Sequence, residues 1–330
     1  METPSKRART EKSHSYPIGR PGEPWDAAER RQWQLRAMKD GPKRSFSADI
    51  LKRLELANDS FSVEQYGELK YTIDGSDFAY PLYMAKSKKW DASKPSALIT
   101  GGVHGYETSG IMGALLFLET QANDYVGRYN IVVAPCVAPW GYEFIQRWNP
   151  DAEDPNRAFK AGQHIQESKA LFNMVESLGI KQWRVHVDLH ETTDTDESEF
   201  MPALAARDGT QFEEETIPDG FYVLGDAGHP DQDAQIAFNK AIIAAVAKVT
   251  HIAPPDKDGK IIGKPVVAGA DGVIMSNKWV VGTCCNGTIA GSRAAYATTT
   301  EVYPDSVSTN ADECNRAQVA AVCAALDYAL

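Results

Sequence analysis

The chain has 330 residues, of which 43% are hydrophobic, and this is enough apolar material to bury one large core. Its formal net charge of -11 argues against nucleic acid and anionic membranes as partners. No apolar run approaches the roughly 18 residues of a membrane span, and the N-terminus is charged where a signal peptide would be apolar. The 5 cysteines include no Cys-x-x-Cys pair, so we expect reduced thiols in a cytoplasmic protein.

The first 60 or so residues divide into a tail and two helices. Residues 1–24 are polar and rich in Lys, Arg, Ser, Pro and Gly, which predicts a disordered basic tail, and its segment 6–9 is a candidate nuclear-import patch. Helical patterns follow over 25–38 and 47–57, with Ser47 expected as the N-cap of the second helix. We therefore expect residues 25–60 to be a helical extension ahead of a single catalytic domain, residues 61–330.

Strands and helices then alternate along the chain. A hairpin is expected at 68–85, because two strand-like runs flank Asp74-Gly75. Further strands are predicted at 97–100, 129–135, 183–189 and 296–304, and helices at 109–121, 163–178, 233–250 and 311–328. This order is typical of an α/β fold with a mixed, mostly parallel central sheet covered by helices on both faces. The irregular segment 199–230 is expected to surround an active site.

A His-x-x-Glu motif follows the strand at 97–100. His104 and Glu107 stand where this strand gives way to a helix, so an imidazole and a carboxylate project from one side of a helical turn. Both can reach one metal ion, and zinc is the natural candidate. Taken alone, such a pair is most often a surface pair at a helix start, so a third ligand must come from elsewhere.

The strand at 183–189 leads to that third ligand. Its apolar residues share one face, while His186, Asp188 and His190 share the other, as polar residues of a half-solvated edge strand also would. His190 lies at the C-terminal end, where open α/β sheets place their ligands, and Asp188 or a backbone carbonyl could accept its second N–H. Two His and one Glu leave the fourth position of a tetrahedral zinc open, which is the pattern of a catalytic site.

Two other segments carry charges that suit hydrolysis. The β-rich run at 296–304 contains Glu301, which could act as a general base if it faces the metal, and which in isolation is equally a surface carboxylate. Arg147 and Arg157 lie in turns beside Asn and Pro. An arginine in such a turn is suited to holding a planar carboxylate, although a loop arginine is usually only solvated.

With these pieces in order, the chain from about 97 to about 304 resembles the zinc metallocarboxypeptidases of the M14 family. Those enzymes carry His-x-x-Glu after a strand, a Gly-Tyr/Phe loop with an Arg, an Asn-Arg-x-Phe motif, a strand ending in a third His, and a late strand with a catalytic Glu. The resemblance implies a carboxypeptidase-like fold with one zinc ion per chain. It implies that the zinc ligands are His104, Glu107 and His190, that Glu301 is the general base, that Arg147 polarises the scissile carbonyl, and that Asn156 and Arg157 hold the terminal carboxylate.

The chain also departs from the digestive enzymes of this family. Tyr106 stands where they have Arg in the His-x-x-Glu motif, and their mobile Tyr has no convincing counterpart, since Trp279 and Tyr296 are only nearby candidates. The Asp-Leu-His sequence followed by Thr192-Thr193 looks like the neighbouring aspartoacylase and succinylglutamate desuccinylase branch, which cleaves N-acyl amino acids.

The sequence thus predicts a zinc metallopeptidase that cleaves an amide bond next to a free carboxylate. The alternatives are an N-acyl amino acid deacylase and a non-catalytic binding protein on the same scaffold. The expected partner is a peptide or N-acyl amino acid with a free carboxylate, with neither nucleic acid nor membrane. An acidic cluster after the third ligand is expected to be solvated, and would favour a basic substrate if it lined the pocket; its members are Asp194, Asp196, Glu197 and Glu199.

Overall fold

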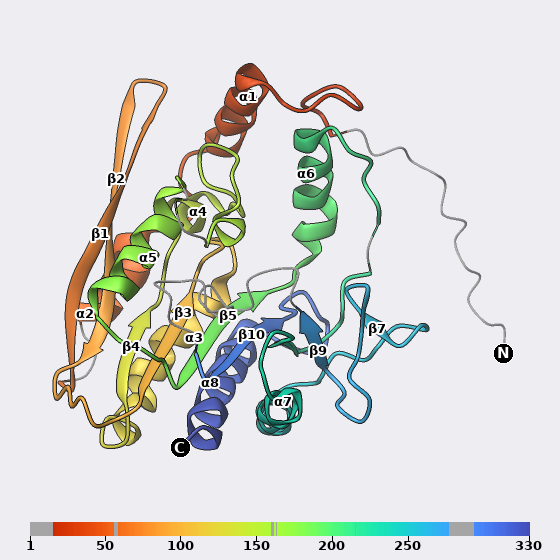
Figure 1. The fold of residues 1–330 in the computed structure, drawn as a ribbon. Helices are drawn as coiled ribbons and strands as arrows, with labels where there is room; N and C mark the ends of the chain where they lie inside the picture. The colour runs from red at the N-terminus through yellow and green to blue at the C-terminus, as the bar shows by residue number, and fades with distance from the viewer. Residues whose placement is uncertain (1–15, 56–58, 160–161, 163, 215, 277–293) are drawn as a thin grey trace.

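One sheet of eight strands runs through the molecule in the order β1-β2-β4-β3-β5-β10-β6-β9 (Figure 1). The computed structural model describes residues 16–55, 59–159, 162, 164–214, 216–276 and 294–330. The strands of the sheet are β1 (Phe61–Ile73), β2 (Ser76–Ser87), β3 (Ser96–Gly101), β4 (Asn130–Ala134), β5 (Val185–Glu191), β6 (Tyr222–Asp226), β9 (Val273–Ser276) and β10 (Tyr296–Val302). A separate small hairpin is made of β7 (Lys260–Ile261) and β8 (Lys264–Pro265).

The centre of the sheet is parallel and its sides are mixed. Strands β4, β3, β5 and β10 pair in parallel, while β1 with β2, β2 with β4, and β6 with β10 are antiparallel. Every residue of β3, β4 and β5 is buried, as expected for parallel strands with both faces covered. The predicted fold class, a mixed and mostly parallel sheet, is confirmed.

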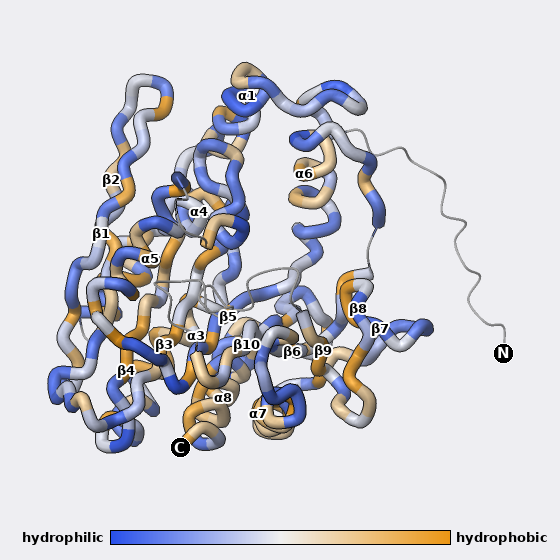
Figure 2. Tube along the Cα trace, viewed as in Figure 1, coloured by the Kyte–Doolittle hydropathy of each residue, from blue (hydrophilic) through white to orange (hydrophobic). Residues whose placement is uncertain are grey.

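Helices cover both faces of the sheet. On one face Ile99 and Val187 share a core cluster with residues of α3 and α8, and on the other Leu98 shares a cluster with Leu171 of α5. Figure 2 shows hydrophobic residues along the central strands and α8, whereas α1 is mostly hydrophilic. The α-helices are α1 (Ala27–Met38), α2 (Lys52–Glu55), α3 (Thr108–Thr120), α4 (Pro139–Phe144), α5 (Gln166–Ser177), α6 (Met201–Asp208), α7 (Gln232–Val246) and α8 (Ala311–Tyr328). Short helical turns are η1 (Ser47–Leu51), η2 (Ala122–Asp124), η3 (Pro155–Arg157) and η4 (Asp196–Phe200).

The N-terminal region corrects two expectations. Within the expected tail Ile18 is only 3% exposed and Tyr16 is half-buried, whereas residues 19–24 are exposed, and the basic patch at 6–9 lies outside the described residues. The expected N-cap Ser47 is wrong, because the hydroxyl of Ser45 accepts the hydrogen bond from the backbone N–H of Ala48. A side chain two residues earlier therefore caps this helix, a shift that is common at helix starts.

The segment 199–230 is more regular than its sequence indicates. It contains α6 and β6, and several of its residues line the main pocket, so it does surround the candidate site. Helix α6 is short and its interior is rich in Ala, which weakens the periodic signal. Across the described residues, no helix is long and apolar enough to cross a membrane.

Candidate metal centre and active site

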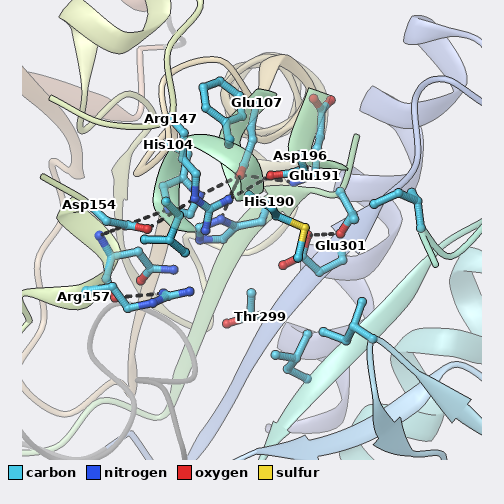
Figure 3. A pocket seen from close by; sticks show the side chains of 18 of the residues that line it. His104, Glu107, Arg147, Asp154, Arg157, His190, Glu191, Asp196, Thr299 and Glu301 are labelled. Carbon is cyan, nitrogen blue, oxygen red and sulfur yellow. Dashed lines mark hydrogen bonds and ion pairs between the residues drawn. The ribbon is translucent and has the colours of Figure 1, made fainter. Parts of the chain in front are cut away.

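The ends of three parallel strands meet at one edge of the sheet. Gly101 of β3 pairs with Leu189 of β5, and Glu301 of β10 pairs with His190 of β5. Because the carboxyl ends of these strands are in register, side chains far apart in sequence reach the same pocket (Figure 3). Its volume of about 350 Å³ lies in the range of small-molecule sites.

The three expected metal ligands come together at this edge. One ligand atom from each of His104, Glu107 and His190 lies within 4.8 Å of the others, and all three side chains are buried. Glu107 lies between the two imidazoles, with its Oε1 atom 2.7 Å from Nδ1 of His104 and its Oε2 atom 2.8 Å from Nδ1 of His190. This buried group is a candidate metal site, because three N and O donors converge on one point.

Close packing of α3 against β5 sets the position of Glu107. A Cβ atom on Gly110 would lie 2.3 Å from the carbonyl oxygen of Leu189, so only glycine allows this approach. The carboxylate of Glu191 accepts a 2.6 Å hydrogen bond from the N–H of Ser109 at the start of α3. In return the N–H of Glu191 donates to Oε2 of Glu107. The end of the strand and the start of the helix thus hold each other in place.

Each imidazole uses its second nitrogen to contact another carboxylate. Nε2 of His104 lies 3.0 Å from Asp154, and Nε2 of His190 lies 2.9 Å from Asp188. Such carboxylates set the tautomer and orientation of a metal-binding imidazole. The lone pair of Nδ1 is then free to coordinate the metal. Of the two partners that the sequence allowed for His190, the structure shows Asp188. The role of Asp154 was not predicted, because its partner lies 50 residues away.

The charges of this cluster favour an ionised Glu107. Burial opposes its ionisation, but the neighbouring His104 and His190 lower the pKa of Glu107 below its usual value. Carboxylates must be ionised to bind a metal, so the site holds this ligand in the form that binding requires.

Arg147 lies in the pocket among carboxylates. Its Nε atom is 3.2 Å from Asp154, and one terminal nitrogen is 3.2 Å from Asp196 and 3.9 Å from Glu107. The hydroxyl of Tyr106 donates a 2.7 Å hydrogen bond to Asp196. Tyr106 therefore supports the carboxylate that positions Arg147.

Asn156 and Arg157 both line the same pocket, on or beside η3. The Oδ1 atom of Asn156 is buried without a hydrogen-bond partner among the described residues, so it is available to a ligand. Asp154 caps this turn by accepting a hydrogen bond from the N–H of Asn156, and the same side chain contacts the imidazole of His104.

Glu301 faces the candidate metal site from β10. Burial raises the pKa of Glu301 to about 8; the nearby carboxylate of Glu107 adds to the increase, and His190 opposes it. Thr192 donates a 3.0 Å hydrogen bond to Oε2 of Glu301, and its hydroxyl lies 2.7 Å from that of Tyr222. The sequence did not single out Thr192 or Tyr222 for this position.

Of the two sequence candidates for the mobile tyrosine, the structure describes only Tyr296, which does not line the pocket. Tyr296 stacks on His229 and Phe238, away from the pocket lining, and Trp279 lies outside the described residues. Tyr222 is the tyrosine that lines the pocket beside Glu301 in the described part of the chain.

Asp194, Asp196 and Glu199 of the acidic cluster after β5 contact other protein groups. Of its four members only Asp196 lines the pocket, and it binds Arg147, Tyr106 and the backbone of Thr193. Glu199 instead pairs with Arg36 at 3.1 Å. The cluster therefore does not support a preference for basic substrates.

Residues 93–217 match the family model of the succinylglutamate desuccinylase/aspartoacylase catalytic domain. This range contains the three candidate ligands and the Asn156-Arg157 pair. The matched segment is less than half of the chain, and the match relates this segment to that catalytic domain. No curated protein matches the chain.

The same fold recurs in solved structures. A protein named provisionally as a metallopeptidase from Shewanella amazonensis SB2B has a TM-score of 0.61 at 20% identity, with 84% of this chain and 91% of that chain covered. A metallo-carboxypeptidase from Burkholderia cenocepacia has a TM-score of 0.53 at 14% identity, covering 92% of this chain and 69% of that chain. Carboxypeptidase A from Helicoverpa armigera has a TM-score of 0.53 at 12% identity, covering 93% and 74%. At these identities the likeness to solved structures shows the fold, and the family model relates residues 93–217 to the succinylglutamate desuccinylase/aspartoacylase catalytic domain.

Proposed function

We propose that this protein is a zinc-dependent hydrolase that cleaves an amide bond next to a free carboxylate, as metallocarboxypeptidases do. The observation that carries the proposal is the convergence of His104, Glu107 and His190 within 4.8 Å, in a pocket that also holds Glu301 and Arg157.

The donor set fits zinc. Two imidazole nitrogens and one carboxylate oxygen are the ligands of a catalytic zinc with an open fourth position. The second nitrogen of each imidazole also contacts a carboxylate, that of Asp154 or Asp188. When bound, zinc would act as a Lewis acid that polarises the substrate carbonyl and promotes ionisation of a water molecule.

Glu301 would serve as the general base. It would take a proton from the attacking water and deliver it to the nitrogen of the departing amine. The hydrogen bond from Thr192 holds one carboxylate oxygen of Glu301, which limits the orientations that the other oxygen can take.

The two arginines would bind different groups of the substrate, the scissile carbonyl and the free carboxylate. Arg147 would donate hydrogen bonds to the carbonyl oxygen as negative charge develops there, and its carboxylate partners hold it beside the site. Arg157 and Asn156 would hold the substrate carboxylate, so that the scissile bond is placed next to Glu107 and its two imidazoles.

A second candidate is an N-acyl amino acid deacylase. The match of residues 93–217 to the succinylglutamate desuccinylase/aspartoacylase domain favours it, and the same groups would perform the same amide chemistry. A non-catalytic binding protein is less well supported, because the three ligand types and Glu301 are all retained around one pocket.

The first experiment is a measurement of metal content by mass spectrometry on protein purified without chelator. We expect about one zinc per chain in wild type, loss of zinc in His190→Ala, and retention in His251→Ala, whose side chain pairs with Asp219 outside the pocket. A panel of C-terminal peptides and N-acyl amino acids then separates the two candidates. Absence of metal from wild type at saturating zinc would overturn the proposal.

A further inference from the structure

One wall of the pocket is apolar and is formed by α6 together with residues before and after it in the chain. We define the α6 wall as Phe200, Met201, Leu204 and Ile217, all of which line the pocket. Leu204 is 41% exposed, although large apolar side chains are usually covered in the described part of the chain. Met201 and Ile217 are half-buried. Exposed apolar surface inside a pocket indicates contact with an apolar ligand group.

The α6 wall adjoins Arg147 rather than Arg157. Phe200 packs on the ring of Tyr106 at 4.8 Å, and Tyr106 and Arg147 both bind Asp196. Figure 3 shows Arg157 well separated from Asp196 across the labelled group. On the proposed function, Arg157 holds the substrate carboxylate and Arg147 the scissile carbonyl. The acyl side of the amide bond would then extend toward the α6 wall.

Contacts with the N-terminal region hold the α6 wall in place. The N–H of Trp25 donates a 2.8 Å hydrogen bond to the carbonyl of Arg207, and Arg36 forms a 3.1 Å ion pair with Glu199. Arg207 in turn donates to the carbonyl of Ala152 at 2.9 Å. Because these contacts form on folding, the wall is ordered before a ligand arrives, which lowers the cost of binding.

Charged groups near the α6 wall already have protein partners. Glu199 pairs with Arg36, Asp196 binds Arg147 and Tyr106, and Arg207 pairs with Asp208 at 2.8 Å. A charged acyl group placed here would lose water without gaining a free partner of opposite charge.

We propose that the α6 wall binds an apolar acyl group, so that the preferred substrates are amino acids acylated with a medium-length aliphatic or aromatic acid. This inference rests on the proposed function and adds the acyl specificity. It predicts discrimination against a succinyl group, which would bring a second carboxylate onto the apolar surface.

The test is a series of alanine derivatives that differ only in their acyl group: acetyl, succinyl, hexanoyl and benzoyl. We expect kcat/KM for hexanoylalanine to exceed that for acetylalanine by about tenfold or more. Leu204→Asp should lower the hexanoyl value by about tenfold and the acetyl value by less, so that the ratio of the hexanoyl value to the acetyl value falls. The matched control is Leu35→Asp, because Leu35 is 43% exposed on α1 and does not line the pocket.

The outcomes separate this inference from the proposed function. Hydrolysis of all four compounds at similar rates, or preference for the succinyl compound, would overturn the role of the α6 wall and keep the hydrolase. If wild type hydrolyses none of them, the proposed function fails, and calorimetry with hexanoylalanine and acetylalanine tests the wall alone. Equal affinities would refute it, as would unchanged hexanoyl binding in Leu204→Asp. Leu204→Ala, checked by thermal melting, replaces the aspartate variant if that variant does not fold.

Discussion

Replacing Asp188 with Asn tests whether the second carboxylate on His190 supports metal binding. Asp188 is fully buried, with one oxygen 2.9 Å from Nε2 of His190 and the other accepting the hydroxyl of Thr100. Asparagine has the same shape, so its oxygen can still accept the imidazole N–H while its amide faces Thr100. The hydrogen bond survives and the negative charge is lost.

The magnitude follows from the position of Asp188. Loss of such a carboxylate typically weakens metal binding by about 10–100-fold. Because asparagine keeps the hydrogen bond, we expect Asp188→Asn near the lower limit, about tenfold, or about 1.4 kcal/mol. Asp188→Ala leaves the imidazole N–H unpaired and should approach about 100-fold.

The assay is zinc affinity measured by competition with a chelator of known affinity at fixed pH. Asp226→Asn is the matched control, because Asp226 is also buried in a strand, at 1% exposure in β6. Its carboxylate accepts a hydrogen bond from the N–H of Gly228 and does not line the pocket. Wild-type zinc affinity in both Asp188 variants would refute the reasoning. An equal loss in Asp226→Asn would attribute the effect to general destabilisation.

Three other substitutions give distinct outcomes. Glu301→Gln should lower kcat by about 100-fold or more while zinc content stays at the wild-type level, because Glu301 is not one of the three clustered ligands; unchanged kcat in steady-state kinetics would exclude it as the base. Arg157→Ala should lower kcat/KM by about 30-fold, equivalent to about 2 kcal/mol, for substrates with a free carboxylate, and should leave their C-terminal amides unaffected; equal losses for both would contradict its role. Burial raises the pKa of Glu167 from 4.5 to about 7, and the hydrogen bond from Tyr71 opposes the increase. The folded state therefore binds more protons between these pH values, so this group makes the protein less stable as pH rises from about 4.5 to about 7, by up to about 3 kcal/mol. Glu167→Gln should lack this slope, and urea unfolding at pH 5 and pH 8 should show a larger loss of stability in wild type; identical pH dependence would show that Glu167 does not titrate in this range.

The central strands and their helices could be predicted because a strand that is buried on both faces has apolar residues at consecutive positions. Residues 131–134 of β4 are an unbroken apolar run, and α8 was predicted with the bounds that the structure shows. The α6 helix was missed, because its interior of small residues carries little periodic signal.

The candidate ligands could also be predicted, because the chemistry of His104 and Glu107 is local. The expected helical turn is instead a turn just before α3, in which the N–H of Glu107 donates a hydrogen bond to the carbonyl of His104. His190 lies at the end of a strand, so each ligand is still marked by its own neighbours in the sequence. The alternating pattern of β5 also indicated that Asp188 and His190 share a face.

The groups that position these ligands depend on the tertiary structure. Asp196 meets Tyr106 across 90 residues and Arg147 across 49 residues, and Asp154 meets His104 across 50 residues. The residues next to such an aspartate in the sequence do not indicate which distant side chain it contacts. The α6 wall likewise depends on contacts from the N-terminal segment, which the sequence indicated only as an extension ahead of the fold. Periodicity and short motifs therefore determined the elements and the ligand types, whereas the charge partners and the shape of the pocket were decided when the folded sheet brought distant loops to one edge.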